Sequence, residues 1–534
     1  MTRDEMVANL GEQTAPWDLI VIGGGATGLG VAVDAASRGY DVVLFEQCDF
    51  AKGTSSRSTK LVHGGVRYLQ QGNVSLVMEA LKERGRLLRN APHLVDDVAF
   101  IVPSYEWWES PFYGIGLKVY DLLAGRYGFG SSQNLSRDEV VAEIPSINPE
   151  GLRGGTRYYD GQFDDARLAI NLATTAFEQG ATVLNYARVV GLLKDGAGAV
   201  TGVTVEDVES GDVHNVSGRV VVNATGPFTD QVRRLDDPGA RPIVAASQGA
   251  HVVLDRSLIA GDSAIMVPHT DDGRVMFAIP WHGVAVVGTT DTPIDSVDLE
   301  PRPLAGEIEF LLDTANRYLR RPATAADVRS VFAGIRPLVS ANSGSAHRGS
   351  AGGDGDTAAL SREHVILIDP VSGLLTIAGG KWTTYRRMAE DVVGNAIMLG
   401  DLEPRACVTR DLPIHGYHRH AERFGRLAFY GSDAAQVENL LQSDDRLAEP
   451  VHPDLELAVG EVVWAAREEM ARTVDDVLAR RSRSLLFDAA AASEAAPRVA
   501  EILATELGRD AAWVGDQIET FRAIASGYLY EGPS

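Results

Sequence analysis

The sequence predicts an α/β protein with three parts: a discontinuous Rossmann-like domain, an α+β domain built on an antiparallel sheet, and an α-helical domain towards the C-terminus. Residues 18–22 are a short, apolar, β-branched run leading into glycines, which is typical of a buried parallel strand. Between residues 247 and 288, apolar strands alternate with Gly, Asp and Pro turns, as in an antiparallel sheet. Beyond Pro404 the apolar residues follow a helical period, notably over 456–478 and 499–507.

The first strand leads into a glycine turn that suits a pyrophosphate. Gly23 and Gly25 let the backbone turn tightly and approach phosphate oxygens without a Cβ in the way, and Gly28 lets the next helix pack close to the strand. That helix is expected over roughly 28–38, with its unpaired N–H groups and positive dipole end facing the anion. The pattern predicts a dinucleotide-binding site.

An acidic residue at the end of the next strand supports this prediction. Residues 41–46 form a second apolar run, and Glu46 follows the glycine turn by about 20 residues. A carboxylate at this point accepts hydrogen bonds from a ribose diol and repels a 2′-phosphate. Glu46 is therefore predicted to bind the ribose.

Length and composition limit the class of protein. The 534 residues are too many for one core and should divide into about three domains. A formal net charge of -24 argues against a nucleic-acid-binding surface. Cys48 and Cys407 provide neither a disulfide framework nor metal-ligand spacing, which predicts no metal and favours a reducing cytoplasmic compartment. No apolar run approaches the roughly 18 residues of a membrane-spanning helix, and the first sixteen residues are expected to be a loose tail.

Strands and helices alternate again further along the chain. Helices are expected over 73–89 and 165–180, and strands over 181–186 and 219–223, the latter ending in a glycine turn. In the antiparallel part, strands are expected over 251–254, 274–279 and 284–287. Residues 341–357 are dense in Gly, Ser, Ala and Asp, so we expect a mobile surface loop in which His347 has no function.

Two polar, glycine-containing segments far apart in the chain are predicted to face the same cofactor. Residues 54–69 follow Glu46 and are too polar for a core element, and Arg67 in this segment offers a bidentate fork for a phosphate or carboxylate. Residues 375–386 repeat the order of strand, glycine turn and helix start. A second cofactor-facing turn so far downstream favours an elongated cofactor, FAD, bound by a discontinuous domain.

These segments together resemble the FAD-dependent glycerol-3-phosphate dehydrogenases, within the wider family that includes D-amino-acid and sarcosine oxidases. The resemblance covers nearly the whole chain and is carried by residues 23–28, 54–69, 224–227, 288–291, 334–338 and 379–386. It implies oxidation of sn-glycerol 3-phosphate to dihydroxyacetone phosphate, with hydride passing from the carbinol carbon to flavin N5.

The resemblance also implies the domain boundaries. The FAD-binding domain should comprise 17–72, 150–240 and 360–400, and the substrate domain 73–149 and 241–340. Residues 341–359 should form the flexible loop, and 404–534 the helical C-terminal domain. The residues expected to bind the cofactor are Gly23, Gly25, Ala26, Thr27, Gly28, Glu46, Thr54, Ser55, Ser58, Lys60, Leu61, His63, Gly64, Gly65, Val189, Ala224, Thr225, Gly226, Gly380, Lys381, Trp382 and Thr383.

A phosphate dianion in a partly dry pocket requires several fixed cations. The residues in family-like motifs that are predicted to bind the substrate are Arg67, Tyr68, Arg336, Arg362 and Lys381. Arg336 and Lys381 are also assigned to catalysis, and Lys381 has the alternative role of stabilising negative charge near flavin N1 and the C2 oxygen.

Hydride departure requires the hydroxyl proton to leave, so a base must lie near the substrate carbinol. His251 is the candidate base, because a neutral imidazole suits proton transfer near pH 7. His63 is its rival, with the alternative role of a flavin neighbour.

The electron acceptor is predicted from the resemblance to be a membrane quinone, since no second fingerprint for a nicotinamide is found. Residues 107–123 are rich in apolar and aromatic side chains, including Trp107, Trp108 and Phe112. They either lie in a bilayer interface, as a peripheral contact on the inner face of the cell membrane, or form an ordinary buried helix.

Three alternative functions remain open at this point. A glycerol-3-phosphate oxidase would share the pocket but pass electrons to oxygen. A nonenzymatic flavin-binding regulatory protein would recruit a partner through its C-terminal helices, and an amine oxidase would need a carboxylate-binding pocket. The C-terminal helices either form a homodimer or cover the catalytic body.

Overall fold

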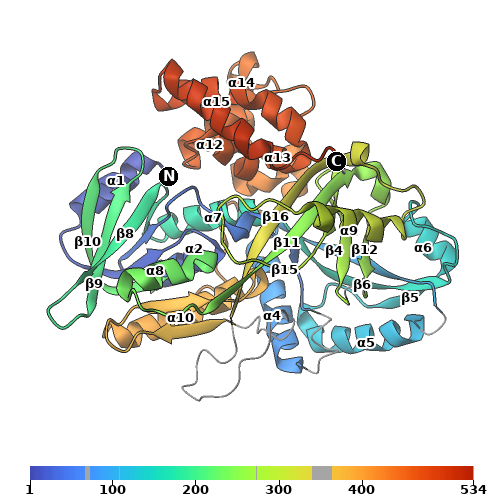
Figure 1. Ribbon diagram of the computed structural model, residues 1–534, viewed down its shortest axis with the longest axis horizontal. Helices are drawn as coiled ribbons and strands as arrows, with labels where there is room; N and C mark the ends of the chain where they lie inside the picture. The colour runs from blue at the N-terminus through green and yellow to red at the C-terminus, as the bar shows by residue number, and fades with distance from the viewer. Residues whose placement is uncertain (66–72, 107–108, 272, 340–363, 533–534) are drawn as a thin grey trace.

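The computed structural model describes residues 1–65, 73–106, 109–271, 273–339 and 364–532. Figure 1 shows three parts: a sheet with its helices on the left, a second sheet on the right, and a group of helices, coloured orange and red, above the junction of the two. The predicted fold class is confirmed.

Parallel strands at the centre of the first sheet hold the cofactor motif. Among the described residues this sheet has eight strands in the order β17-β18-β10-β1-β2-β7, with β9 paired to β10 and β8 to β9. Its strands are β1 (Trp17–Ile22), β2 (Val42–Phe45), β7 (Thr182–Leu184), β8 (Ala187–Lys194), β9 (Val200–Asp207), β10 (Val213–Asn223), β17 (Val365–Ile368) and β18 (Leu375–Ala378). β1 lies between β10 and β2, parallel to both. Its carboxyl end therefore opens at the edge of the sheet where a ligand can bind.

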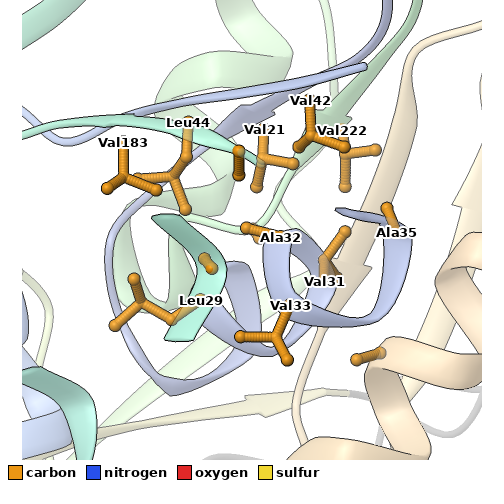
Figure 2. Packing of buried hydrophobic residues seen from close by; sticks show 14 of the residues in the cluster. Val21, Leu29, Val31, Ala32, Val33, Ala35, Val42, Leu44, Val183 and Val222 are labelled. Carbon is orange, nitrogen blue, oxygen red and sulfur yellow. The ribbon is translucent and has the colours of Figure 1, made fainter. Parts of the chain in front are cut away.

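The helix after β1 is apolar on nearly every side because it is covered on nearly every side. α2 (Ala26–Ser37) contacts both α7 (Asp165–Glu178) and α10 (Tyr385–Leu399). Figure 2 shows its aliphatic side chains in one cluster with those of β1, β2, β7 and β10. α2 begins at Ala26, two residues before the predicted start, because Gly25 already serves as the N-cap in an extended conformation. α8 (Thr229–Asp236) completes this part.

The second sheet is mostly antiparallel and is organised around one long strand. The described residues give ten strands in the order β15-β11-β14-β13-β12-β4-β6-β3, with β16 paired to β11 and β5 to β6. The strands are β3 (Leu61–Val62), β4 (Val95–Ser104), β5 (Gln133–Ser136), β6 (Gly154–Phe163), β11 (Val244–Asp255), β12 (Ala264–Val267), β13 (Met276–Trp281), β14 (Val284–Gly288), β15 (Thr292–Pro293) and β16 (Val328–Val339). The one parallel pair described is β12 with β4. β11 is longer than the predicted 251–254 and pairs with β14, β15 and β16.

Two strands of this sheet come from segments assigned by resemblance to the cofactor domain. β3 and β6 pair with each other, and β6 also pairs with β4. The helices of this part are α4 (Val74–Asn90), α5 (Glu109–Ala124), α6 (Arg137–Glu143) and α9 (Ala305–Asn316). The chain therefore crosses between the two sheets directly after the loop that follows Glu46.

The C-terminal part is helical, as predicted, but the helix expected over 456–478 is interrupted. Its helices are α11 (Ala434–Ser443), α12 (Val459–Glu468), α13 (Ser484–Phe487), α14 (Ala489–Leu507) and α15 (Ala511–Ala525). α12 ends before Met470, which has a φ of 54°. Asp476 accepts hydrogen bonds from the backbone N–H groups of Arg472 (2.7 Å) and Thr473 (3.0 Å), so the backbone is capped there before a π-helical turn over Asp476–Arg481. The second expected helix, 499–507, lies within the longer α14.

The expectation of a loose N-terminal tail is wrong. Residues Arg3–Glu12 form α1, whose N-cap Thr2 accepts a hydrogen bond from the Glu5 N–H at 3.3 Å. Met6 is fully buried against the first sheet, and Arg3 pairs with Asp207 at 2.8 Å. Leu10 also packs against this core, so a few inward-facing side chains anchor the helix.

The segment before α11 folds back onto α7 through a partly exposed charge cluster. Burial alone would lower the pKa of His415, but hydrogen bonds of 2.7 Å each to Asp433 and Glu178 raise its pKa to about 9. The folded state therefore binds this proton more tightly than the unfolded state, in which the pKa is about 6.5. The resulting stabilisation is fully present below about pH 6.5 and disappears as the pH rises through about 9.

We expect His415→Gln to be destabilised relative to the wild type at pH 6 by at most about 3 kcal/mol. The difference should shrink as the pH rises towards 9.5, because the wild-type imidazole is then neutral in both states. Thermal unfolding of the two proteins at pH 6, 7.5 and 9.5 measures the effect. A difference that does not depend on pH would show that the charge of His415 does not stabilise the fold.

Candidate active site

A cavity of about 360 Å³ lies at the carboxyl end of β1. Its glycine turn cannot carry side chains. A Cβ on Gly23, whose φ is 111°, would lie 2.7 Å from the Ala224 carbonyl oxygen, and a Cβ on Gly28 would lie 1.9 Å from the Gly23 carbonyl oxygen. The turn is therefore fixed by close backbone contacts to β10 and to the first turn of α2.

Glu46 lines the same cavity with both carboxylate oxygens held in place. One oxygen accepts the Gly24 N–H at 2.7 Å and the other the Cys48 N–H at 2.9 Å. Burial raises the pKa of Glu46, and the two backbone N–H groups act against that rise. Each carboxylate oxygen has a second lone pair, so Glu46 can still accept hydrogen bonds from a ribose diol.

Two distant segments close the other side of the cavity. The Ser55 hydroxyl oxygen accepts the Ala26 N–H at 2.9 Å, and the Trp382 indole donates to the Ser55 carbonyl oxygen at 2.9 Å. Gly379 and Gly380 have φ values of 79° and 84°, which turn the chain along the cavity after β18. A glycine cradle at a helix start, a ribose-facing carboxylate and a second glycine turn fit FAD.

A second cavity of about 300 Å³ adjoins the first. The two share Thr54, Pro337, Gly380, Lys381 and Trp382 along their walls. Beyond this junction the second cavity is lined by residues from the loop after Glu46, from β6, β11, β12, β13 and β16, and from the segment after β14. A ligand in the second cavity would therefore lie beside the end of an elongated cofactor in the first.

His251 lies in the wall of the second cavity in a rigid environment. Its ring stacks on Phe332 with a centroid distance of 4.5 Å and an interplanar angle of 4°, and its Nε2 is 2.9 Å from the Thr59 hydroxyl oxygen. Burial, followed by the positive charges of Arg336 and Lys60, holds the pKa of His251 well below its usual value. The imidazole is therefore neutral at pH 7, as a general base must be.

Arg336 reaches into the cavity from β16 across the middle of β11. Its guanidinium pairs with Asp291 at 3.2 Å and donates to the Thr289 hydroxyl oxygen at 3.0 Å and to the Thr290 carbonyl oxygen at 2.9 Å. A Cβ on Gly249 would lie 2.3 Å from Arg336 Nη2, so the guanidinium lies directly over the glycine backbone. The strand therefore needs glycine where the guanidinium passes.

Most of the predicted site residues line one cavity or the other. Those lining the first cavity are Gly23, Gly25, Ala26, Thr27, Glu46, Thr54, Ser55, Val189, Ala224, Thr225, Gly226, Gly380, Lys381 and Trp382. Those lining the second are Thr54, Ser58, Leu61, His63, Gly65, His251, Arg336, Gly380, Lys381, Trp382 and Thr383. Arg67, Tyr68 and Arg362 lie outside the described residues, as do Trp107, Trp108 and the predicted loop over 341–357 with His347.

Gly28, Lys60 and Gly64 were predicted to bind the cofactor, but they line neither cavity. Gly28 packs against the Gly23 carbonyl oxygen. The Lys60 ammonium group is fully buried and donates to Asp165, at 2.7 Å and 2.8 Å to its two oxygens, and to the Ser56 carbonyl oxygen at 2.7 Å. Burial lowers its pKa to about 7. The Gly64 N–H donates to the Tyr120 hydroxyl oxygen at 2.9 Å. Lys60 and Gly64 therefore hold the loop after Glu46 in place through contacts on the side that faces away from the cavities.

The sequence interpretation missed several polar residues that line the second cavity, among them Arg57, Thr59, Asp160 and Arg274. Arg57 and Thr59 lie inside the predicted binding loop, so the loop was identified without them. Arg274 was taken as the first residue of a strand, although a cation between a turn and a strand is also a signal of a binding residue.

Comparisons with known proteins agree with this geometry. A family model described as FAD dependent oxidoreductase matches residues 18–386, and one described as C-terminal domain of alpha-glycerophosphate oxidase matches residues 375–513. The chain is 38% identical to the mitochondrial glycerol-3-phosphate dehydrogenase of Homo sapiens, over 96% of this chain and 73% of that one. It is 37% identical to the mitochondrial enzyme of the same name from Schizosaccharomyces pombe, over 95% of this chain and 87% of that one.

A solved structure is similar over the whole length. The glycerol-3-phosphate dehydrogenase from Bacillus halodurans, complexed with FAD, superposes with a TM-score of 0.79 and 29% identity, covering 99% of this chain and 98% of that chain. The similarity thus includes both sheets and the C-terminal helices.

Proposed function

Because this chain belongs to the FAD-dependent oxidoreductases and, within them, to the glycerol-3-phosphate dehydrogenase family, we propose that it oxidises sn-glycerol 3-phosphate to dihydroxyacetone phosphate and passes the electrons to a membrane quinone. The observation that carries the proposal is the junction of the two cavities. There, Lys381 and Trp382 belong to both walls, while His251 and Arg336 line the second cavity alone.

The residues of the second cavity divide the chemistry between them. When bound, FAD supplies the two-electron acceptor for the hydride that leaves the carbinol carbon. His251, neutral at pH 7, accepts the proton of the carbinol hydroxyl at Nε2, with the Thr59 hydroxyl beside it. Arg336 attracts the phosphate by the positive charge of its guanidinium group, and Lys381 adds a positive charge at the junction with the cofactor cavity.

The reaction is tested by mixing the purified holoprotein with glycerol 3-phosphate without oxygen and following the flavin absorption band. We expect the band to bleach with glycerol 3-phosphate and to persist with glycerol, sarcosine or D-alanine. Persistence with glycerol 3-phosphate would refute the proposal and favour a nonenzymatic flavin-binding protein. Bleaching by the amino compounds instead would indicate an amine oxidase.

The acceptor requires a separate assay. The relatives named above are dehydrogenases, whereas the C-terminal family model takes its name from an oxidase. We expect fast turnover with a soluble quinone analogue and little hydrogen peroxide in air. Stoichiometric peroxide release would assign the protein to the oxidases.

Peripheral contact with a membrane is supported by the two faces of α5. Tyr113, Leu117 and Tyr120 are buried against the second sheet, whereas Ile115 and Leu122 are 69% and 80% exposed. One face of α5 therefore packs as a core helix does, and the opposite face exposes the apolar side chains that an interfacial helix needs. In Figure 1, α5 and α4 lie along one edge of the molecule, and α4 adds the exposed side chains of Val74 and Met78. Among the described residues, no helix is long and apolar enough to cross a bilayer.

Replacing Ile115 and Leu122 together with serine should weaken binding to phosphatidylcholine vesicles by roughly 10-fold or more, because each leucine-sized side chain contributes about 1.5–3 kcal/mol when it leaves water. Vesicle flotation measures the bound fraction. The matched control replaces two exposed apolar residues elsewhere, Val371 and Met398, which are 72% and 74% exposed. Equal binding by both double variants would contradict the assignment of α5.

A further inference from the structure

We propose that the Thr59 hydroxyl relays the proton of the substrate carbinol to His251, so that base catalysis in the second cavity needs a threonine as well as a histidine. The inference rests on the proposed function and adds the route by which the proton reaches the imidazole. It starts from one contact in the second cavity, where Thr59 Oγ1 lies 2.9 Å from His251 Nε2.

The His251 ring is enclosed by its partners on both neighbouring strands. Phe332 of β16 and Gly288 of β14 pair with His251 from opposite sides of β11. The Phe332 ring stacks on the imidazole at a centroid distance of 4.5 Å. A Cβ on Gly288 would lie 2.2 Å from His251 Cδ2 and 2.8 Å from Nε2, so the glycine backbone lies against the imidazole. The ring is therefore held in one orientation.

The Thr59 hydroxyl occupies the position from which a group donates to Nε2. A base accepts at an unprotonated nitrogen, so Thr59 is the donor of the 2.9 Å hydrogen bond when His251 is ready to accept a proton. An unprotonated imidazole nitrogen has a single lone pair. A carbinol hydroxyl therefore cannot donate to Nε2 while Thr59 does.

Thr59 is more accessible from the cavity than His251. His251 is 2% exposed, whereas Thr59 is partly exposed, and both line the second cavity. A hydroxyl group has one proton to donate and two lone pairs that accept. While it donates to Nε2, Thr59 can therefore accept the carbinol O–H of a ligand in the cavity.

The residues on either side of Thr59 fix its place in the wall. Ser58 donates to Asp165 through its N–H at 3.0 Å and through its hydroxyl at 2.7 Å. The Lys60 ammonium group donates to the same carboxylate at 2.7 Å. Asp165 lines neither of the two cavities, so both neighbours of Thr59 are anchored on the side away from them. The Thr59 hydroxyl is thus in place before a substrate binds.

The relay moves two protons and one hydride. The carbinol O–H bond breaks as its proton passes to Thr59 Oγ1, and the original O–H bond of Thr59 breaks as that proton passes to His251 Nε2. The C–H electron pair of the carbinol leaves with its hydrogen as the hydride that bound FAD accepts, and the carbinol becomes a carbonyl group. Thr59 regains its hydroxyl, and His251 becomes an imidazolium. Because the pKa of His251 lies well below its usual value, the imidazolium releases the proton before the next turnover.

The test compares Thr59→Ser, Thr59→Ala and Thr59→Val with the wild-type holoenzyme, by the rate of anaerobic flavin reduction with glycerol 3-phosphate. Thr59→Ser should react at nearly the wild-type rate, because the hydroxyl remains. Thr59→Val should be slower by roughly 100-fold or more, since a methyl group replaces the hydroxyl and the contribution of the base is lost. Thr59→Ala should lie between, because the space it leaves admits a water that relays the proton instead.

Binding is measured separately, by calorimetric titration of the oxidised holoenzyme with dihydroxyacetone phosphate. The affinity of all three variants should change by less than about tenfold, the scale of one neutral hydrogen bond. The loss in Thr59→Val should thus appear in the rate of reduction and not in binding.

The number of protons in motion is tested by measuring the same rate in mixtures of H2O and D2O. In the wild type the rate should depend on the deuterium fraction along a curve, because two protons move together. A linear dependence would indicate the transfer of one proton and would contradict the relay.

Thr204→Val is the matched control. The Thr204 hydroxyl donates to Asn215 at 3.0 Å, its residue is partly exposed as Thr59 is, and it lines neither of the two cavities. This variant should be reduced as fast as the wild type. FAD content and melting temperature, measured for every variant, separate misfolding from a defect in proton transfer.

Each outcome bears on one claim. A wild-type rate in Thr59→Val, or a Thr59→Ser variant as slow as Thr59→Val, would overturn the inference while the proposed function stands. Equal rates in Thr59→Ala and Thr59→Val, or a loss of product affinity as large as the loss of rate, would reduce Thr59 to a structural or binding residue and also overturn it. Absence of flavin reduction in the wild type would refute the proposed function, and the relay with it.

Discussion

Replacing Arg336 with alanine is expected to weaken the binding of glycerol 3-phosphate by about 2–4 kcal/mol, or roughly 30- to 1000-fold. Arg336 makes four hydrogen bonds or ion pairs to residues of β11 and of the segment after β14, so its fork is held rigidly before substrate arrives. A cation that is already held in place loses little side-chain entropy when phosphate binds. Removing Arg336 also leaves the negative charge of Asp291 less compensated, and this carboxylate then repels the phosphate.

The measurement is the anaerobic titration of flavin absorption with glycerol 3-phosphate. FAD content should be unchanged, because Arg336 lines the second cavity and not the first. Arg329→Ala is the control, since Arg329 lies on the same strand but pairs with Asp255 and Asp488 at the surface. Substrate affinity in Arg336→Ala equal to that of the control would remove Arg336 from the site.

Replacing Asp49 with alanine is expected to lower the free energy of unfolding by about 3–5 kcal/mol. Asp49 is fully buried and binds Arg481 through two hydrogen bonds of 2.6 Å and 2.9 Å, and it also accepts from Arg480. Burial alone would raise the pKa of Asp49, but the two guanidinium groups lower it, so the carboxylate is charged. Its loss would leave buried positive charge uncompensated.

The same substitution should weaken FAD binding, because Asp49 begins the segment whose residues 51–55 line the first cavity. Lys52 of that segment pairs with Asp475 at 2.7 Å, which adds a second link to the C-terminal part. In Figure 1 the C-terminal helices lie above the junction of the two sheets, as this anchoring requires.

Chemical denaturation and FAD dissociation are measured for Asp49→Ala and for Asp444→Asn. Asp444 is the matched control, because it pairs with Arg446, whose side chain is 80% exposed. The control should unfold as the wild type does. Wild-type stability and FAD affinity in Asp49→Ala would show that the C-terminal part does not support the cofactor loop.

The residues around the glycine turn could be predicted from sequence because the forces there are local. Gly23 is required by its own φ of 111° and Gly28 by a backbone contact to Gly23 five residues earlier, and Glu46 follows at the end of the neighbouring strand. Such spacing is visible in a single sequence. FAD as cofactor and the family were both confirmed.

The sequence could not give the direction of side chains in the loop after Glu46. Lys60 has a φ of 63°, which turns its side chain away from the cavities and towards Asp165. The partner of Lys60 is more than a hundred positions away, so no local pattern reveals it. Arg274 escaped notice for a similar reason, since its relation to Asp291 depends on how β13 and β14 pair.

The predictions for the helices near the two ends of the chain were wrong for different reasons. α1 carries few apolar residues, yet Met6 and Arg3 are buried and Leu10 packs against the core of the first sheet. Residues 456–478 are periodic enough to predict one helix, but Arg480 and Arg481 must reach Asp49, and the chain breaks after α12 to let them do so. In both cases tertiary contacts override the local pattern.

The central claim is that the two cavities meet so that FAD and a phosphate monoester lie side by side. A crystal structure of the protein with FAD and dihydroxyacetone phosphate tests it most directly. We predict the flavin ring at the junction formed by Gly380, Lys381 and Trp382, with the ligand carbonyl beside His251 and its phosphate on Arg336. A flavin ring outside this junction, or a phosphate bound away from Arg336, would contradict the account.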